Sequence, residues 1–300
     1  MSVPPSDAVL VLRSPQLEVV VLPDKGADVY SVIDRATGID VLFKSPWGWR
    51  DPATVPPMGE SQADWLARYP GGWQLLVPNA GPEREYDGVL RGFHGEAAVI
   101  TWNVDEWTAT TARLSTDLAT APLHLEREFV ADGPDLEVVT LIRNTSPRTV
   151  PVMCVEHAAF GAPFLDARCR LDTSARRIAA ASGYDKITDF AAVPPPGALR
   201  SVFAGLADFA AETGFAQTWV SIASPSAGFG IRMAWDSATL PHAWLWEEAG
   251  GVLGYPWFGR AYVAGVEPAN VLPDDGLAET PLLGAHQEWR TTVTLSRFEL

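Results

Sequence analysis

Cysteine is scarce in this 300-residue sequence, with only Cys154 and Cys169 present. The two could pair, but nothing requires it, and no Cys-x-x-Cys or Cys/His cluster with metal-ligand spacing occurs. The chain also has no run of about 18 apolar residues, and its N-terminus lacks the basic start and apolar core of a signal peptide. We therefore expect a cytoplasmic, reduced protein that binds no metal and crosses no membrane.

Basic residues are in the minority, with 22 Lys and Arg against 37 Asp and Glu and a net charge of −15. Proteins that bind nucleic acid neutralise its phosphates with an excess of Lys and Arg. Anionic membrane surfaces attract the same residues. The charge balance therefore argues against nucleic acid and against a membrane surface as partners.

Several catalytic motifs are also missing. The sequence contains no Gly-x-Ser-x-Gly, no phosphate loop, no His-Glu-x-x-His and no dinucleotide-binding fingerprint. A glycosidase needs only two carboxylates at a set spacing across the scissile bond, which a sequence cannot exclude. A hydrolase or a lyase that acts on sugars therefore stays open at this point.

Long amphipathic helices are nearly absent. Short runs of apolar and β-branched residues alternate with turn signals instead, most clearly in residues 8–44, 97–149 and 219–298. This pattern predicts an all-β fold, one large antiparallel β-sandwich that forms a single domain over residues 1–300. Two curved sheets packed face to face would offer a concave surface to a ligand.

Two segments depart from the strand pattern. Residues 45–70 hold five prolines, and Ser61 to Tyr69 predicts one or two helical turns with Ser61 as the N-cap. We expect this excursion to border a ligand site. Residues 204–213 are predicted to form a second short helix.

A dense polar loop follows the short apolar strand at Trp73–Val77. It contains Asn79, Arg91 and His94, and the histidine stands between two glycines. A polar loop at the end of a buried strand is a common way for a rigid scaffold to present a ligand site. An ordinary surface loop can have the same composition. The prediction of a ligand site here therefore depends on residues in other parts of the chain.

Two ionisable residues lie at the ends of apolar strands and provide that support. His157 lies near the end of the apolar run that begins at Val150, and Glu267 lies at the end of the apolar run that begins at Ala261. Histidine exchanges protons near neutral pH, and burial raises the pKa of a Glu toward the range of a general base. The alternatives are a satisfied core histidine and a Glu that reaches water at the mouth of a strand.

The sequence is rich in tryptophan, with 12 residues. Most tryptophans belong to cores, but an exposed Trp also stacks on the apolar C–H face of a sugar. Trp246 stands beside Glu247 and Glu248, which could bind the hydroxyls of a sugar or could merely make the turn before Gly250-Gly251 polar. We therefore count Trp246 and Glu248 as candidate substrate-binding residues.

Taken in order, these segments resemble the aldose 1-epimerase (galactose mutarotase-like) superfamily, and most closely its divergent bacterial branch. The resemblance covers most of the chain. It is carried by LEVVVLPDKGA at residues 17–27, GGWQLLVPNAG at 71–81, GFHGEA at 92–97, EHAAFGAPFL at 156–165 and WLWEEAGGVLGYPWFGRAYVAGVEPAN at 244–270. Each motif is weak alone, and their order and spacing give the match its strength.

The resemblance implies a β-supersandwich and an enzyme that interconverts sugar anomers. His157 aligns with the acid that protonates the ring oxygen, and Glu267 with the base at the anomeric hydroxyl. His94 aligns with the histidine that holds the ring oxygen, and Asn79 with a residue that orients the substrate. This chemistry needs no metal, cofactor or covalent intermediate.

Two departures from the family pattern leave the sugar open. Many relatives have Asn-Arg ahead of the first histidine motif, whereas Ala80 follows Asn79 here and Arg91 stands at a different spacing. No clear Asp grips the sugar hydroxyls in the late strand. A sugar-phosphate epimerase would need a cluster of Arg side chains at the mouth of its site. Arg84, Arg91 and Arg260 could form one, but acidic residues are interleaved with them.

We therefore expect a small-molecule sugar as the ligand and an enzyme that is a monomer or a homodimer. The alternative from another class is a non-catalytic carbohydrate-binding domain with the same fold. Convergence of His94, His157 and Glu267 on one cleft would favour the enzyme.

Overall fold

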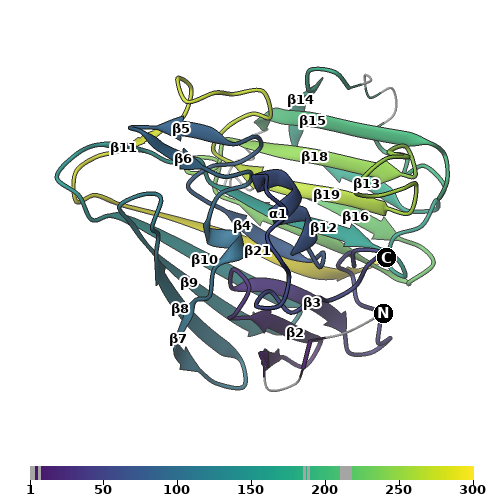
Figure 1. Cartoon of the computed structure of the whole chain (residues 1–300). Helices are drawn as coiled ribbons and strands as arrows, with labels where there is room; N and C mark the ends of the chain where they lie inside the picture. Colours follow the sequence, from purple (N-terminus) through teal and green to yellow (C-terminus); the bar gives the residue numbers. More distant parts are fainter. Residues whose placement is uncertain (1–3, 6–7, 185–186, 188–189, 210–217) are drawn as a thin grey trace.

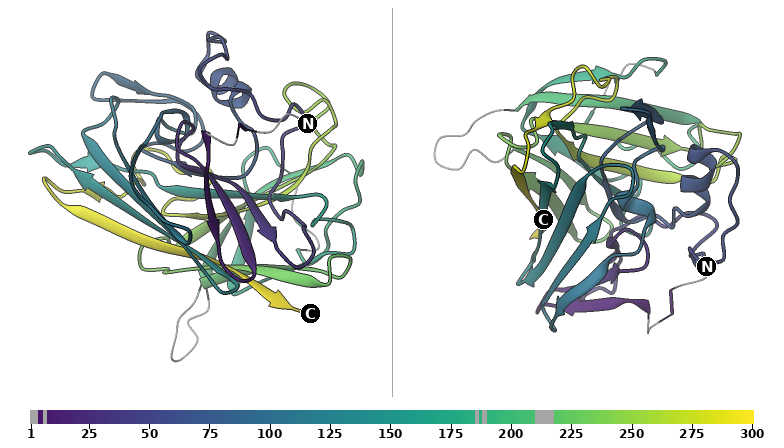
Figure 2. Two further views of the ribbon diagram at one scale, coloured as in Figure 1. Left: turned by 90° about the horizontal axis from the view of Figure 1, so that it is seen from below. Right: turned by 60° about the vertical axis from the view of Figure 1, so that its left-hand side comes forward.

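Strands dominate the computed structural model, which describes residues 4–5, 8–184, 187, 190–209 and 218–300. Two large antiparallel sheets account for most of them (Figure 1). This is the all-β sandwich that the alternating apolar runs predict. Figure 2 gives two further views of the same arrangement.

The larger sheet has nine strands in the order β1-β2-β3-β4-β12-β19-β18-β15-β14. Strands far apart in the sequence therefore become neighbours at its centre. The strands span β1 (Leu10–Arg13), β2 (Leu17–Leu22), β3 (Asp28–Asp34), β4 (Trp73–Leu76), β12 (Val155–Gly161), β14 (Ala175–Ala180), β15 (Arg200–Phe209), β18 (His242–Ala249) and β19 (Tyr262–Ala269).

The second sheet has eight strands in the order β13-β16-β17-β21-β10-β9-β8-β7. They span β7 (Asn103–Trp107), β8 (Thr111–Asp117), β9 (Leu123–Asp132), β10 (Asp135–Asn144), β13 (Arg170–Thr173), β16 (Thr218–Ser224), β17 (Phe229–Trp235) and β21 (Glu288–Glu299). Two small pairs complete the described strands: β5 (Arg84–Tyr86) with β6 (Val89–Arg91), and β11 (Val150–Pro151) with β20 (Leu282–Leu283).

One apolar core lies between the two large sheets. It contains Val19 and Leu245 from the nine-stranded sheet and Phe129 and Val138 from the eight-stranded sheet, all buried. Successive side chains of a strand point to opposite faces, so the alternation of apolar and polar residues along β9 turns one face to this core.

A buried ion pair also joins the sheets. Arg127 of β9 donates to Glu156 of β12 at 2.6 Å, and both side chains are fully buried. The same carboxylate accepts from Trp73 Nε1 at 2.7 Å and from the Thr140 hydroxyl at 2.7 Å. Its two oxygens are thus satisfied within the core, as a buried charge requires.

The predicted excursion at residues 45–70 leaves the sheet and carries helix α1 (Ser61–Ala67). Figure 1 shows α1 in front of β4 and β12, on the face of the nine-stranded sheet that does not face the second sheet. No helix in the described part of the chain is long and apolar enough to cross a membrane.

The structure corrects three details of the sequence interpretation. Glu60 rather than Ser61 occupies the N-cap of α1, and the Ser61 hydroxyl instead donates to Glu83 at 2.6 Å. Residues 204–209 belong to β15 and not to a helix, and the rest of that predicted helix lies outside the described residues. Residues 97–99 form a short 3₁₀ turn, η2 (Ala97–Val99), where a strand was expected.

Candidate functional site

Three neighbouring strands of the nine-stranded sheet bring His157 and Glu267 together. In the antiparallel pair β12–β19, Ala158 lies opposite Val266. The residues one position before Ala158 and one after Val266 are His157 and Glu267, so they project side by side from the same face. On the other side of β19, Trp244 of β18 lies opposite Glu267.

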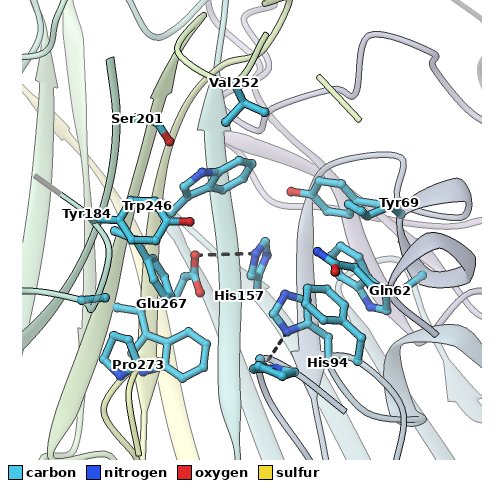
Figure 3. Close-up of a pocket in the computed structure, with 18 of the residues that line it drawn as sticks. Gln62, Tyr69, His94, His157, Tyr184, Ser201, Trp246, Val252, Glu267 and Pro273 are labelled. Carbon is cyan, nitrogen blue, oxygen red and sulfur yellow. Dashed lines mark hydrogen bonds and ion pairs between the residues drawn. The ribbon is translucent and has the colours of Figure 1, made fainter. Parts of the chain in front are cut away.

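The two ionisable groups lie close without satisfying one another. His157 Nε2 and Glu267 Oε1 are 3.6 Å apart (Figure 3), longer than a hydrogen bond. Both residues are buried, with 5% and 1% of their surfaces exposed. His157 Nδ1 and Glu267 Oε1 have no hydrogen-bond partner in the described structure. Buried polar atoms without partners are rare, so these two call for an explanation.

Gly265 keeps space open beside the carboxylate. It lies two residues before Glu267 on the same face and opposite Trp246 of β18. A β carbon at Gly265 would lie 2.8 Å from Glu267 Oε1 and 3.2 Å from the Trp246 side chain. The glycine thus allows the carboxylate and the indole to share this part of the site.

His94 reaches the same site from the polar loop. Its φ of +59° is in the left-handed region, which is uncommon for a residue other than Gly and is often found at functional sites. The next residue, Gly95, packs so tightly that a β carbon would lie 2.4 Å from the Val77 carbonyl. His94 Nδ1 accepts the Gly81 N–H at 2.9 Å, so in the neutral ring the proton is on Nε2.

The three residues line a cavity of about 360 Å³. His94 and His157 have ring centroids 5.7 Å apart, so both rings contribute to one wall (Figure 3). Eight of the described lining residues are aromatic, namely Trp65, Tyr69, Phe93, Tyr184, Phe203, Trp244, Trp246 and Trp257. A concave, mostly apolar pocket with a few converging polar groups is typical of a small-molecule site.

Burial determines the charge of the pair. It raises the pKa of Glu267 well above its usual range and lowers the pKa of His157 to about 4. Burial, with smaller contributions from His157 and Arg84, also lowers the pKa of His94 well below its usual value. At neutral pH both histidines are therefore uncharged. Burial also favours the uncharged form of Glu267, in which the proton shared by the pair lies on the carboxyl.

Apart from the two histidines, the ionisable groups of the pocket wall are acidic. Glu267 and Asp274 are among the described lining residues, whereas no Lys or Arg is. Within the described parts of the chain, no three His, Cys, Asp or Glu side chains gather closely enough to hold a metal ion. Cys154 and Cys169 are both buried and unpaired.

The structure brings four of the seven predicted site residues together. His94, His157, Trp246 and Glu267 line the cavity, whereas Asn79, Arg91 and Glu248 are not among its described lining residues.

Those three residues hold the backbone around the pocket. The Asn79 amide donates to the carbonyls of Pro82 and Gly92, at 2.8 and 3.0 Å. Arg91 donates to the Pro151 carbonyl at 2.8 Å, and Glu248 accepts the Val252 N–H at 3.0 Å. A substrate contact by any of the three stays a prediction.

The sequence interpretation missed several lining residues. Trp65, Leu66 and Tyr69 come from α1 and the residues after it, which confirms that the excursion borders the pocket. Ser182 and Asp274 lie near the mouth, where the Asp274 carboxylate accepts the Ser182 N–H at 3.0 Å. The break in the strand pattern was the only sequence signal for Trp65, Leu66 and Tyr69. No sequence signal pointed to Ser182 and Asp274.

Comparisons with known proteins agree on fold and family. Residues 6–295 match the family described as a domain of unknown function (DUF4432). A search of curated protein sequences found no match.

Solved structures of similar shape cover nearly the whole chain. A protein of Synechocystis sp. PCC 6803 has a TM-score of 0.74 at 15% identity, covering 100% of this chain and 99% of its own. A candidate aldose 1-epimerase from Escherichia coli has a TM-score of 0.71 at 15% identity, covering 97% and 99%. A galactose mutarotase-like protein from Clostridium acetobutylicum has a TM-score of 0.68 at 14% identity, covering 97% and 95%. At these identities the likeness shows the fold, which is the galactose mutarotase-like sandwich.

Proposed function

The chain belongs to the DUF4432 family and has the galactose mutarotase-like fold, and from these premises we propose that it is an aldose 1-epimerase. It would interconvert the anomers of a free sugar by acid/base opening and closure of the ring. Glu267 would exchange the proton of the anomeric hydroxyl, and His157 would exchange a proton with the ring oxygen. The Nε2–H of the His94 imidazole is its free donor and would donate a hydrogen bond to the ring oxygen of the sugar.

The observation that carries this proposal is the buried, mutually unsatisfied pair of His157 and Glu267, 3.6 Å apart in an aromatic pocket. Anomerisation removes one proton from O1 and delivers one to O5. A neighbouring acid and base can do both within one bound sugar, and each positioned group contributes about 10²–10⁴-fold in rate. A fold relationship alone would not support a reaction, because one fold hosts many functions.

The single proton of the pair suits a reaction that runs in both directions. Burial places the proton on Glu267, whereas the proposed roles for ring opening use the form with the proton on His157. The two forms differ by the transfer of one proton between neighbouring atoms, and each offers one donor and one acceptor. Such a pair titrates as a unit, so the number of protons that it holds matters more than their assignment.

NMR saturation exchange between the anomers of D-glucose, D-galactose, D-mannose, L-rhamnose, L-arabinose and D-xylose tests the proposal. We expect the protein to accelerate exchange above the spontaneous rate for at least one of these sugars. Glu267→Gln should lower that acceleration by about 10²–10⁴-fold, because the amide cannot exchange the proton. Glu137→Gln, on an exposed position of β10, is the matched control and should be fully active.

Full activity of Glu267→Gln would overturn the proposed mechanism. Saturable binding of a sugar without any exchange would identify a non-catalytic carbohydrate-binding domain instead, which the aromatic wall would also suit. The sugar-phosphate alternative receives no support from the described lining residues. Arg84 is engaged by Asn79 and by the Ala80 and Asp275 carbonyls, and Arg91 by Pro151.

A further inference from the structure

The hydroxyl of Tyr69 is a buried polar group that nothing in the described structure satisfies. Only 1% of the residue is exposed, and its oxygen has no hydrogen-bond partner. A buried tyrosine hydroxyl normally finds a partner, because an unpaired polar group costs free energy. Tyr69 is not needed for the proton transfers proposed above, so its hydroxyl calls for another explanation.

The hydroxyl faces the candidate site. Tyr69 lines the cavity, and Figure 3 shows its oxygen on the side of the ring that faces His157 and Trp246. The ring stacks on Trp65 with centroids 4.8 Å apart and meets the His157 ring edge-on at 5.7 Å. A ligand that touches His157 therefore also lies beside the Tyr69 ring.

The side chain is held in place before any ligand binds. The Tyr69 carbonyl accepts hydrogen bonds from the Ser45 hydroxyl at 2.6 Å and from Trp47 Nε1 at 2.9 Å. These bonds fix the backbone at the point where the chain leaves α1, and the ring contacts fix the side chain. A preorganised donor loses little entropy when it binds.

The hydroxyl keeps its proton. Burial and the nearby Glu267 carboxyl raise the pKa of Tyr69 well above its usual value. The group therefore acts as an uncharged donor at neutral pH.

We propose that the Tyr69 hydroxyl donates a hydrogen bond to a non-anomeric hydroxyl of the bound sugar and thereby helps to determine which sugar is accepted. The assignment rests on the proposed function, in which Glu267 takes the anomeric hydroxyl and the two histidines take the ring oxygen. The remaining polar groups of a monosaccharide are the other hydroxyls. A site built to pair with a hydroxyl discriminates against an analogue that lacks it.

Tyr69→Phe removes only this oxygen. The aromatic contacts remain, so we expect the variant to fold and to have a melting temperature equal to or above that of the wild type, since an unpaired buried group is lost. For the best substrate of the sugar panel, KM should rise by about 3- to 15-fold, the loss of one neutral hydrogen bond, while kcat changes less. Tyr86→Phe, on β5 and outside the lining residues, is the matched control and should leave KM unchanged.

Monodeoxy analogues of that sugar then identify the partner hydroxyl. The analogue that lacks the partner hydroxyl should bind the wild type more weakly, by the same factor by which Tyr69→Phe raises KM for the parent sugar. The Tyr69→Phe variant should bind this analogue and the parent sugar equally well. Such a cycle isolates the pairwise interaction. A lower melting temperature with unchanged KM would assign the hydroxyl to the structure and overturn the proposal.

The failure of this proposal differs from the failure of the proposed function. If the wild type accelerates anomer exchange and Tyr69→Phe has the same KM for every sugar and analogue, only the role of Tyr69 is wrong. If the wild type neither binds nor converts any sugar of the panel, both proposals are wrong.

Discussion

At the scale of single residues, the site depends on two groups whose surroundings move their pKa values in opposite directions. Burial disfavours the charged form of each group, so the pKa of Glu267 rises and the pKa of His157 falls to about 4. Perturbed groups in a cleft are typical of functional sites. Between those two pKa values the pair keeps one proton, and that range of pH can be measured.

The dependence of kcat/KM on pH should therefore be flat from about pH 5 up to the raised pKa of Glu267. Below about pH 4 His157 also takes up a proton and the pair loses its acceptor. Above the raised pKa of Glu267 the pair loses its donor. With ordinary pKa values the histidine would be the donor, and its protonated fraction would fall about 25-fold between pH 6 and pH 8. Anomer exchange at pH 6 and pH 8, corrected for the spontaneous reaction, distinguishes the two cases.

Glu247 provides the control for this profile. Burial raises its pKa to about 7, but it is not among the described lining residues. Glu247→Gln should leave the profile flat between pH 6 and pH 8. A wild-type profile that falls across this interval and stays unchanged in Glu247→Gln would show that the pair does not titrate as its burial indicates.

At the scale of elements, the site combines three rigid strands with one braced loop. β12, β18 and β19 hold His157, Trp246 and Glu267 through their ladder, whereas His94 depends on the loop between β4 and the 3₁₀ turn. Asn79 closes that loop by bonding the carbonyls of Pro82 and Gly92, and it also accepts a hydrogen bond from Arg84 at 3.0 Å.

Asn79→Ala should destabilise the protein by about 1–3 kcal/mol, because two carbonyls and one guanidinium lose a buried partner. The loop would relax and displace His94, so the sugar should also bind more weakly. Urea unfolding and KM on the same samples measure both effects. Asn103→Ala, on exposed β7, is the control and should be neutral. A loss of affinity with unchanged stability would instead support the direct substrate contact that the family resemblance implies.

At the scale of the whole molecule, the site depends on the docking of the two sheets. Glu156 immediately precedes His157 on β12 and points to the opposite face, into the core between the sheets. There it meets Arg127 of β9. The face that carries the candidate site is thus attached through its other side to the second sheet.

Arg127→Met should cost about 3–5 kcal/mol of unfolding free energy, since it leaves the Glu156 charge buried without its partner. Adding Glu156→Gln should recover most of that loss, because the amide oxygen still accepts from Trp73 or Thr140 and no charge remains. Denaturant unfolding of both variants measures the difference. Arg113→Met breaks the exposed pair with Glu106 and should cost less than about 1 kcal/mol. Equal losses of unfolding free energy at the two sites would show that the buried pair contributes no more to stability than an exposed one.

The sequence by itself determined the fold class, because the alternation of apolar and polar residues reflects which face of each strand is buried, and that is a local property. It also determined that His94, His157 and Glu267 are candidates, since each stands in a recognisable segment. It did not show that the side chains of Asn79, Arg91 and Glu248 bind neighbouring backbone groups and are not among the described lining residues of the cavity. Those outcomes depend on strand register and loop closure, which bring together residues far apart in the chain.

Only the tertiary structure placed Tyr69 beside His157 and Trp246 beside Glu267. The segment that carries Tyr69 has no strand periodicity, and its position over β4 and β12 follows from packing against a surface that the rest of the chain must first form. The burial that shifts the pKa values of His157 and Glu267 has the same origin. Desolvation comes from all the neighbours of a group at once, and no local stretch of sequence specifies them.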